Sequence, residues 1–368
     1  MTRRFIIACG GTGGHLFPGL AVAEVLHQRG HEILLLVSEK EIDATALKAH
    51  PQFQAEKLPS VGMPSSILSP ALVGFLRRCG SSYSQCRAII KKWQPHAVLG
   101  MGGFTSTAPI IAARFKGIPC FVHESNAIPG RANKLAARFT DNVLLGFDEC
   151  RPFFPGSKCL VTGTPVRANL GSRLDRVLAM RGFGLDPAKP VLLVTGGSQG
   201  AGGINQILFR CAPFFASPGL QIIHLTGKND DRLAAANYQR EGIPHFVAPF
   251  HHRMEEAYSV ADLVVSRAGA SSLGELASFG LASILIPYPY ATDDHQRVNA
   301  RIFSAAGAAI LCPEKEVVPE VFAAMVSNLL GDGTRRSEMA RRALALNPAD
   351  AAGKVADILE NASRKEGA

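Results

Sequence analysis

The 368-residue chain has little of several residues that mark common protein classes. Aromatic residues make up only 7% of it, with one tryptophan, and no basic run is interleaved with aromatic residues. Nucleic acid is therefore the least favoured partner, because binding it usually requires stacking surfaces beside positive charge. The eight cysteines form no CxxC pair and no zinc-like spacing, which argues against a cysteine metal site and fits a reducing cytoplasm.

Long apolar runs are also missing. No stretch approaches the ~20 apolar residues that a membrane-spanning helix needs, and the start, MTRRFIIACGG, has too short an apolar run for a signal peptide. We therefore expect a protein that is soluble or peripheral to a membrane. The net charge of +9 favours an acidic partner, such as a phosphorylated substrate or an anionic membrane surface.

Two glycine-rich loops of the same design are the strongest positive signal. The first lies in FIIACGGTGGHLFPGL from Phe5, and the second lies in PVLLVTGGSQGAGGINQ from Pro190. Each follows a short apolar run and precedes an amphipathic one, which predicts a strand, a turn and a helix. Small residues let the backbone approach a ligand, and N–H groups at a helix start attract anions. Two such loops predict two nucleotide-fold domains that bind a phosphate-bearing ligand.

Strand and helix patterns alternate along the chain, which predicts an α/β fold with parallel sheets covered by helices. We expect strands at 4–9, 32–37, 97–100, 119–123, 142–146, 191–195, 221–225, 245–248, 263–265 and 283–286. We expect helices at 18–29, 40–49, 70–93, 105–115, 130–138 and 296–306, then a helical tail with a last helix near 350–363. The rhythm is interrupted between Thr162 and Lys189, so the domain boundary is expected near 163–168.

The motif GGTGGH at 10–15 places His15 at a predicted helix start. It departs from the dinucleotide fingerprint, because Leu16 stands where the last glycine belongs and Glu39 lies too far along to be the ribose-binding acid. No Gly-Lys-Ser/Thr follows, so it is not a Walker loop either. A histidine at this position can move a proton near neutral pH. A tight turn without a ligand is the alternative.

HESNAIPG at 123–130 follows a predicted strand and contains His123, Glu124 and Asn126, with Asn133 in the next predicted helix. In doubly wound folds ligands bind at the carboxyl ends of strands, so these polar residues indicate a site. Ordinary turn chemistry, with Asn126 bonding the local backbone, is the alternative.

The second half of the chain has two further polar motifs. SRAGASSLGE at 266–275 ends in Glu275, whose carboxylate can accept bonds from two ribose hydroxyls. Ser272 and Glu275 also have the spacing of a capping box, and the sequence does not decide between these roles. In DDHQRVNA at 293–300, Gln296 and Asn299 would share a helix face suited to hydroxyl recognition. The chain has no DxD pair of the kind that holds a divalent ion on a sugar nucleotide, so we expect no catalytic metal.

The segment 65–93 combines an apolar stripe with basic residues: Leu68, Leu72, Phe75, Leu76, Arg77, Arg78, Lys91 and Lys92. A core-facing stripe is one interpretation of this pattern. A peripheral membrane patch, to which each basic residue adds about 1 kcal/mol on anionic lipid, is the other.

Six motifs occur in the order and spacing of one family: GGTGGH, HESNAIPG, GTPVR at 163–167, GGSQGA, SRAGASSLGE and DHQRVNA. Across nearly its whole length the chain resembles the MurG family, the bacterial enzymes that add N-acetylglucosamine to lipid I in peptidoglycan synthesis. The resemblance implies a GT-B fold of glycosyltransferase family 28, with two Rossmann-like, doubly wound domains facing each other across a cleft. It implies an acceptor- and membrane-side domain at 1–165, joined by a C-terminal helix at about 349–368, and a UDP-N-acetylglucosamine-binding domain at 166–348.

The resemblance also implies an activity. N-acetylglucosamine would pass with inversion from UDP-N-acetylglucosamine to the C4 hydroxyl of undecaprenyl-pyrophosphoryl-N-acetylmuramoyl-pentapeptide, without a cofactor. The expected partners are UDP-N-acetylglucosamine, lipid I, the anionic cytoplasmic face of the bacterial plasma membrane and other cell-wall synthesis proteins. Two alternatives remain: a UDP-N-acetylglucosamine 2-epimerase on the same scaffold, and a non-catalytic module that binds a nucleotide sugar.

By motif position, the resemblance implies that Ser198 and Arg167 meet the donor diphosphate and that Glu275 holds the ribose. Further substrate contacts are expected from Thr12, Gly13, Gly14, Asn126, His251, Ala270, Ser271, Ser272, Leu273, Gly274 and Gln296. His123 and Asn133 are expected on the acceptor side. Our hypothesis is that His15 is the catalytic base or positions the acceptor, with Glu124 as the alternative base.

Three residues depart from the family pattern. Ser125, Thr164 and Phe104 stand where the family usually has glutamine, asparagine and tyrosine. The third change removes a hydroxyl near the acceptor side, so a role for that hydroxyl is not expected in this chain.

Overall fold

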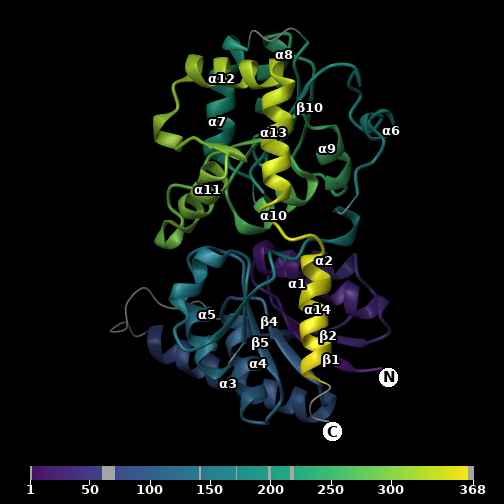
Figure 1. Ribbon diagram of the computed structural model, residues 1–368, viewed down its shortest axis with the longest axis vertical. Helices are drawn as coiled ribbons and strands as arrows, with labels where there is room; N and C mark the ends of the chain where they lie inside the picture. Colours follow the sequence, from purple (N-terminus) through teal and green to yellow (C-terminus); the bar gives the residue numbers. More distant parts are fainter. Residues whose placement is uncertain are drawn as a thin grey trace. The chain divides into compact units, whose positions relative to one another are not determined.

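The computed structural model describes residues 2–59, 71–140, 142–170, 172–197, 200–215 and 219–363. The chain divides into two compact units (Figure 1): unit 1 is Met1–Arg167 with Asp350–Ala368, and unit 2 is Ala168–Ala349. Within the described ranges, no helix combines the length and apolar composition that crossing a membrane requires.

Among its described residues, unit 1 contains a seven-stranded parallel sheet with the order β3-β2-β1-β4-β5-β6-β7. The strands are β1 (Arg4–Ala8), β2 (Glu32–Ser38), β3 (Gln54–Leu58), β4 (Ala97–Gly100), β5 (Cys120–Glu124), β6 (Asn142–Leu145) and β7 (Lys158–Val161). The helices are α1 (Gly13–Gln28), α2 (Glu41–Lys48), α3 (Ala71–Trp93), α4 (Phe104–Arg114), α5 (Arg131–Ala136) and α14 (Ala351–Ala362).

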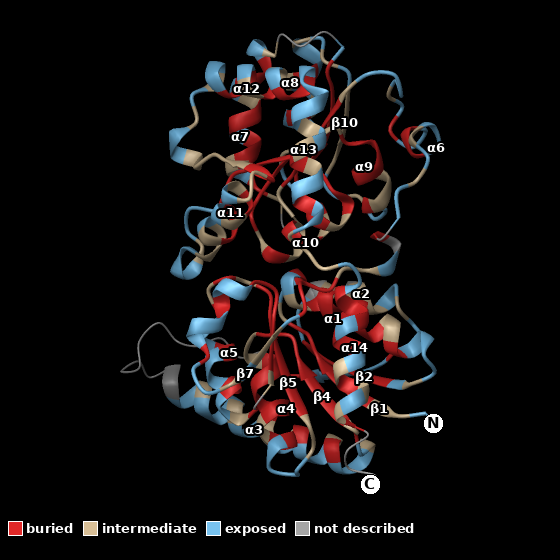
Figure 2. Cartoon of the chain, in the orientation of Figure 1, coloured by how far each residue is buried: buried red, intermediate tan, exposed pale blue. Residues whose placement is uncertain are grey.

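The central strands of unit 1 are buried on both faces because helices cover each side (Figure 2). Along β1, Phe5 and Ile7 join a core that includes residues of α1 and α14, whereas Ile6 and Ala8 join a core that includes residues of α3 and α4. The two-residue period of a strand thus distributes one apolar run between two cores.

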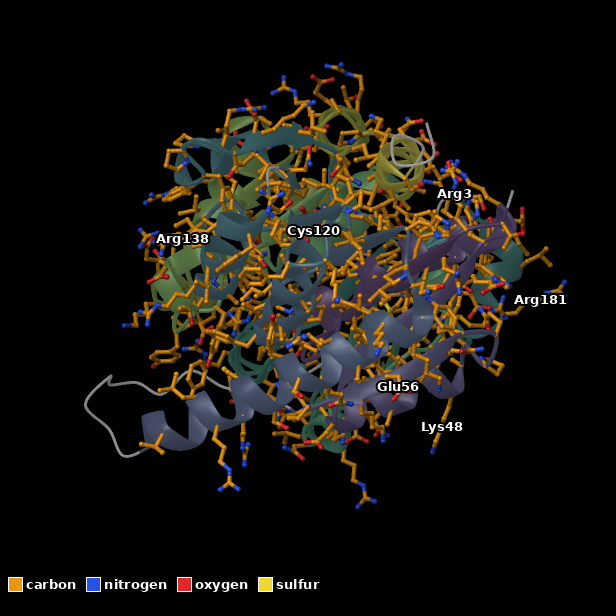
Figure 3. The ribbon with its side chains drawn as sticks, turned by 90° about the horizontal axis from the view of Figure 1, so that it is seen from below. Arg3, Lys48, Glu56, Cys120, Arg138 and Arg181 are labelled. Carbon is orange, nitrogen blue, oxygen red and sulfur yellow. The ribbon has the colours of Figure 1, made fainter. Side chains whose placement is uncertain are left out.

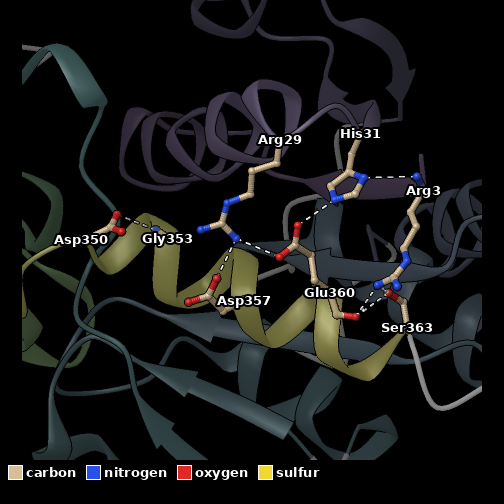
Figure 4. A network of polar contacts seen from close by, with 8 residues as sticks. All are labelled: Arg3, Arg29, His31, Asp350, Gly353, Asp357, Glu360 and Ser363. Atoms are coloured by element: carbon tan, nitrogen blue, oxygen red, sulfur yellow. Dashed lines mark hydrogen bonds and ion pairs between the residues drawn. The ribbon is translucent and has the colours of Figure 1, made fainter. Parts of the chain in front are cut away.

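Helix α14 comes from the far end of the chain and packs on α1. Val355, Ala356 and Leu359 are buried in the core of unit 1. Around them, polar contacts bind the helix to unit 1 (Figure 4): Arg29 pairs with Asp357 at 2.7 Å and with Glu360 at 2.9 Å, and His31 lies 2.7 Å from Glu360. The C-terminal helix is therefore an integral part of unit 1.

Unit 2 has the same kind of sheet. Its described residues form a six-stranded parallel sheet with the order β10-β9-β8-β11-β12-β13. The strands are β8 (Val191–Thr195), β9 (Gln221–Leu225), β10 (His245–Ala248), β11 (Leu263–Ser266), β12 (Ser283–Leu285) and β13 (Ala309–Leu311). The helices are α6 (Arg176–Met180), α7 (Gly202–Cys211), α8 (Asp231–Arg240), α9 (Met254–Val260), α10 (Ala270–Phe279), α11 (His295–Ala305), α12 (Pro319–Gly331) and α13 (Gly333–Leu344).

Both units thus have the doubly wound order of a Rossmann fold, which confirms the expected α/β class. In such a sheet the ligand crevice lies where the strand order reverses, at the carboxyl ends of the strands. That point lies between β1 and β4 in unit 1, and between β8 and β11 in unit 2.

The structure corrects two expectations about the elements. Three strands, β3, β7 and β13, were not expected from the sequence, and all three lie at sheet edges. The first helix begins at Gly13 instead of residue 18, because Pro18 lies inside the helix and not at its start. The first glycine loop therefore supplies the opening turn of α1.

Candidate active site

The first glycine loop follows β1 and leads directly into α1. Thr12 is the residue before the helix, and its carbonyl accepts the backbone N–H groups of His15 and Leu16 at 3.1 and 3.0 Å. The Thr12 hydroxyl lies 3.2 Å from Nδ1 of His15. Gly13 is buried, whereas Thr12 and Gly14 are exposed. The half-buried imidazole of His15 is thereby fixed at the carboxyl end of β1.

A second turn, Gly102–Gly103 after β4, forms the other side of this position. A side-chain carbon at Gly102 would lie 2.8 Å from both Cδ2 and Nε2 of His15, and Gly102 has a φ of +115°. Glycine is therefore required here both by the backbone conformation and by the close approach of the ring. Ser106 holds the turn, because its hydroxyl accepts the Gly102 N–H at 3.0 Å and lies 2.7 Å from the Gly102 carbonyl. His15 thus lies at the point where the strand order of unit 1 reverses.

Burial lowers the pKa of His15 to about 4. The nearby positive charge of Lys40 lowers the pKa further, and the carboxylate of Asp43 opposes both effects. The ring is therefore neutral at pH 7 and able to accept a proton.

Glu124 shapes the loop that follows β5. Its Oε1 accepts the backbone N–H and the side-chain amide of Asn126 at 2.9 and 3.2 Å, and its Oε2 accepts the Gly130 N–H and the Asn133 amide at 3.0 and 2.8 Å. Burial raises the pKa of Glu124, and these four donors oppose the rise. A carboxylate whose two oxygens already accept four hydrogen bonds from neighbouring residues is poorly suited to act as the base. This geometry favours His15 as the base.

His123 and Asn133 lie beneath the site instead of on its surface. His123 is completely buried, with Nε2 2.9 Å from the Gly163 carbonyl and Nδ1 3.2 Å from the Ser125 hydroxyl. Asn133 is also buried, and its amide donates to the His123 carbonyl at 3.0 Å. The expected direct contact of these two residues with the acceptor does not fit their burial, which favours a supporting role.

The three residues that differ from the family pattern are packed within unit 1. Ser125 contacts His123 through its hydroxyl, and Thr164 is buried. Phe104 packs edge-on against Phe75 of α3, with ring centroids 5.5 Å apart. Arg167, the last residue of this part of unit 1, lies over the ring of Phe17 at 4.9 Å.

In unit 2, the glycine loop after β8 meets the first turn of α10. Ser198, with Gln199, lies outside the described residues, so its expected diphosphate contact remains a prediction. A side-chain carbon at Gly197 would lie 3.9 Å from the Ser272 hydroxyl, which brings two of the predicted motifs together. A side-chain carbon at Gly200, with a φ of +72°, would collide with the Thr226 carbonyl. The loop is therefore compact enough to require glycine.

Helix α10 carries the predicted residues Ala270, Ser271, Ser272, Leu273, Gly274 and Glu275 in its first two turns. Its N-cap is Gly269, and no side chain caps it, so Ser272 and Glu275 do not form the capping box. The half-buried carboxylate of Glu275 instead accepts a hydrogen bond from the Tyr258 hydroxyl at 2.7 Å. Tyr258 lies on α9, and this contact fixes Glu275 beside the helix start.

His251 precedes α9 and packs among aromatic rings. Its ring centroid lies 5.1 Å from that of Phe183 and 6.1 Å from that of Phe246. Its Nε2 lies 3.1 Å from a carboxylate oxygen of Glu256. The ring is half-buried, and these contacts fix its orientation.

Gln296 and Asn299 brace the loops around α10. The Gln296 carbonyl oxygen accepts the Tyr288 N–H at 3.0 Å, and the buried Asn299 amide donates to the Ala268 carbonyl at 3.1 Å. The hydroxyl recognition expected of Asn299 therefore does not fit its burial, whereas Gln296 is only half-buried.

Several residues that organise the site were missed by sequence reasoning. Asp43 and Lys40 bind the first glycine loop, Tyr258 binds Glu275, and the buried Arg267 pairs with Glu314 at 2.7 Å. The signal for Asp43 was an acid shortly after the second strand, the region where nucleotide folds place a ribose-binding acid. Among the described residues, no group of three His, Cys, Asp or Glu side chains is arranged to hold a metal.

Comparison with known proteins defines the class. Residues 5–145 match the glycosyltransferase family 28 N-terminal domain, and residues 191–359 match the family 28 C-terminal domain. The crystal structure of Acinetobacter baumannii MurG is 29% identical, with a TM-score of 0.77 over 98% of this chain and 100% of that one. A putative UDP-N-acetylglucosamine 2-epimerase from Listeria monocytogenes, 12% identical with a TM-score of 0.66 over 96% and 95% of the two chains, shares the fold alone. The protein is thus a glycosyltransferase with two Rossmann-like domains, of the GT-B type.

A full-length relative from Geobacter metallireducens is 38% identical over 371 residues, covering 99% of this chain and all of the relative. It is named UDP-N-acetylglucosamine–N-acetylmuramyl-(pentapeptide) pyrophosphoryl-undecaprenol N-acetylglucosamine transferase. The chain belongs to glycosyltransferase family 28 and, within it, to the MurG enzymes.

Proposed function

We propose that this enzyme transfers N-acetylglucosamine from UDP-N-acetylglucosamine to the C4 hydroxyl of lipid I, giving lipid II for peptidoglycan synthesis. The observation that carries this proposal is the 38% identity, over nearly the whole of both chains, to a relative named for that reaction. The fold alone does not decide, because a putative 2-epimerase has it too.

On the donor side, we assign UDP-N-acetylglucosamine to unit 2. Glu275, fixed by Tyr258, would accept the ribose hydroxyls, and His251 would lie beside the uracil. The N–H groups of the first turn of α10 and of the glycine loop with Ser198 would meet the diphosphate. Gln296 would contact the sugar.

On the acceptor side, His15 is the proposed base. The acceptor hydroxyl is a poor nucleophile, and a neutral imidazole can take its proton as the oxygen attacks C1. The bond between C1 and the UDP oxygen breaks as the new bond forms, so one displacement inverts the anomeric centre. Thr12, Gly13 and Gly14 belong to the same loop as His15, and with Asn126 they would supply further substrate contacts.

The leaving diphosphate gains negative charge during the displacement. Oriented N–H groups and the guanidinium of Arg167 would stabilise that charge, so we expect the reaction to need no metal. Activity that persists in EDTA would agree with this; a loss that magnesium restores would contradict it.

We further propose that the enzyme works as a peripheral protein on the anionic cytoplasmic face of the bacterial plasma membrane, where other cell-wall synthesis proteins act on its product. Helix α3 supports this, because Val73 and Leu76 expose 72% and 58% of their surface on a helix that also bears Arg77, Arg78, Lys91 and Lys92. Of the predicted stripe, Leu68 and the Leu72 side chain fall outside the described residues.

The deciding experiment is transfer of labelled N-acetylglucosamine to a short-chain lipid I analogue. We expect a labelled disaccharide product and free UDP, both dependent on the analogue. Conversion of UDP-N-acetylglucosamine without any acceptor would favour a 2-epimerase. Binding of the donor with no turnover on the analogue would favour a non-catalytic module.

A further inference from the structure

Two residues at the start of α2 form hydrogen bonds with both backbone polar groups of Gly11 in the first glycine loop. Asp43 is completely buried, and its Oδ2 accepts the Gly11 N–H at 2.9 Å and the Ser38 N–H at 2.8 Å. The Lys40 ammonium donates to the Gly11 carbonyl at 2.7 Å. In nucleotide folds the loop amides are offered to a ligand phosphate. Here the Gly11 amide is already bound to a carboxylate of the protein itself.

This anchoring has a direct geometric consequence for His15. Gly11 has a φ of +111°, and the residue after it, Thr12, is the N-cap of α1. Gly10 packs so closely on the backbone of Ser38 that any side chain there would collide with it. The path of the chain into α1 is therefore fixed by contacts with the end of β2 and the start of α2. His15 follows within the first turn of that helix.

We propose that Asp43 and Lys40 are positioning residues for His15: by clamping Gly11 they hold the imidazole against the Gly102 turn in the place where it acts on the acceptor. The inference rests on the proposed role of His15 as the base. It gives the first glycine loop a different task from the second, namely to position a proton acceptor and not to cradle a phosphate.

The same two residues are the charged groups that act on the His15 ring. The positive charge of Lys40 lowers the pKa of His15, and the negative charge of Asp43 raises it. His123 also lies near, but burial lowers its own pKa to about 4, so it is neutral at pH 7. Removing the charge of Lys40 must therefore raise the pKa of His15, and removing that of Asp43 must lower it.

The test compares Lys40→Met and Asp43→Asn with two matched controls. Lys48→Met changes the exposed lysine at the other end of α2, whose side chain points away from the protein (Figure 3). Asp148→Asn changes an exposed aspartate of unit 1. Imidazole NMR titration of the full-length protein gives the pKa of His15, with its signal assigned from its loss in His15→Ala. Turnover is measured against pH with the lipid I analogue, and donor affinity is measured separately.

We expect Lys40→Met to raise the pKa of His15 by about half a pH unit or more, and Asp43→Asn to lower it. The acidic limb of kcat should move in the same directions. Asp43→Asn should also lower kcat about tenfold or more at pH 7, with donor affinity within about twofold, because the ring is no longer held in place. Both controls should match the wild type.

An unchanged pKa of His15 in Lys40→Met and Asp43→Asn, or an undiminished kcat in a folded Asp43→Asn protein, would overturn the proposal. If Asp43→Asn does not fold, as shown by circular dichroism, the exposed Lys40→Met variant decides alone. If the pKa of His15 changes as expected in both Lys40→Met and Asp43→Asn, while His15→Ala retains full turnover, His15 is not the base. Asp43 and Lys40 would then still hold Gly11 and His15 in place, but the proposal that this positioning serves catalysis would be wrong.

Discussion

Three segments of unit 1 determine the position of His15. The loop after β1 precedes it, the turn after β4 lies against its ring, and Lys40 and Asp43 at the start of α2 bind Gly11 in that loop. The sequence placed His15 correctly at the start of a helix after a strand, because the glycine cluster and the apolar run before it are local signals. Its surroundings could not be predicted, because the strand order of the sheet brings Gly102 to its ring and Asp43 to Gly11 in the loop before it.

His15→Ala tests the assignment of the base at the residue scale. We expect kcat to fall about 10²- to 10⁴-fold, the usual contribution of a positioned general base. The affinity for UDP-N-acetylglucosamine should change little, because His15 is assigned to the acceptor side and not to donor binding. Steady-state kinetics with the lipid I analogue, together with calorimetric donor binding, measures both. Undiminished turnover would remove His15 from the mechanism.

Glu275→Ala tests the donor side. A carboxylate that accepts ribose hydroxyls contributes charge-assisted hydrogen bonds, each worth about 1.5–3 kcal/mol, so donor affinity should fall about tenfold or more. Tyr258→Phe is the matched comparison, because it keeps the carboxylate but removes the hydroxyl that orients it at 2.7 Å. We expect this variant to lose less affinity than Glu275→Ala. Equal donor affinity in Glu275→Ala and the wild type would assign Glu275 a structural role.

Motif spacing located polar residues at the ends of strands, whereas their roles stay predictions. Glu124, His123 and Asn133 were correctly singled out as a polar group at the end of β5. Their burial and mutual hydrogen bonds favour loop-forming roles over substrate contact. A sequence pattern gives the positions of polar side chains along a strand end, but it does not give the direction in which each one points.

At the scale of elements, the central strands and the edge strand β10 were predicted from the sequence, whereas the edge strands β3, β7 and β13 were not. β3 reads QAEKL and exposes most of its residues, and β7 is only partly buried. β3 and β7 each pair with a neighbouring strand on one side only, so neither is buried like a central strand, whose sequence is a continuous apolar run. The early start of α1 was missed for another reason, since proline normally marks the first turn of a helix and Pro18 lies beyond it.

Leu359→Ala tests how far α14 stabilises unit 1. Leu359 is 1% exposed in the core that α1 and α14 share, so its truncation should lower the free energy of unfolding by about 2–5 kcal/mol. Asp357→Asn removes an ion pair whose carboxylate is 59% exposed, and it should cost less than about 1 kcal/mol. Urea unfolding monitored at Trp93, the one tryptophan of the chain, reports on unit 1 specifically. Equal stability of the two variants would show that the apolar contacts of α14 are dispensable.

At the scale of the whole molecule, the order of six motifs identified the family, and the matches to both family 28 domains and to the Geobacter metallireducens relative confirmed it. Motif order is informative at this scale because each motif follows a strand of a doubly wound sheet, so their sequence reflects the topology itself. The sequence signal for membrane attachment is weaker, because an amphipathic stripe on a helix also arises from packing against a core.

The exposed apolar residues of α3 make that attachment testable. The double variant Val73→Ser, Leu76→Ser removes two side chains that would enter the lipid interface, so binding to anionic vesicles should fall about tenfold or more. The matched control is Leu233→Ser, Val321→Ser, which removes two residues of unit 2 that are 55% and 66% exposed. The control should bind like the wild type, and binding of all three proteins should weaken with salt because basic residues contribute to it. Vesicle sedimentation measures each binding constant. If the α3 variant and the control bind equally well, α3 is not the membrane-facing element and its exposed side chains have another cause.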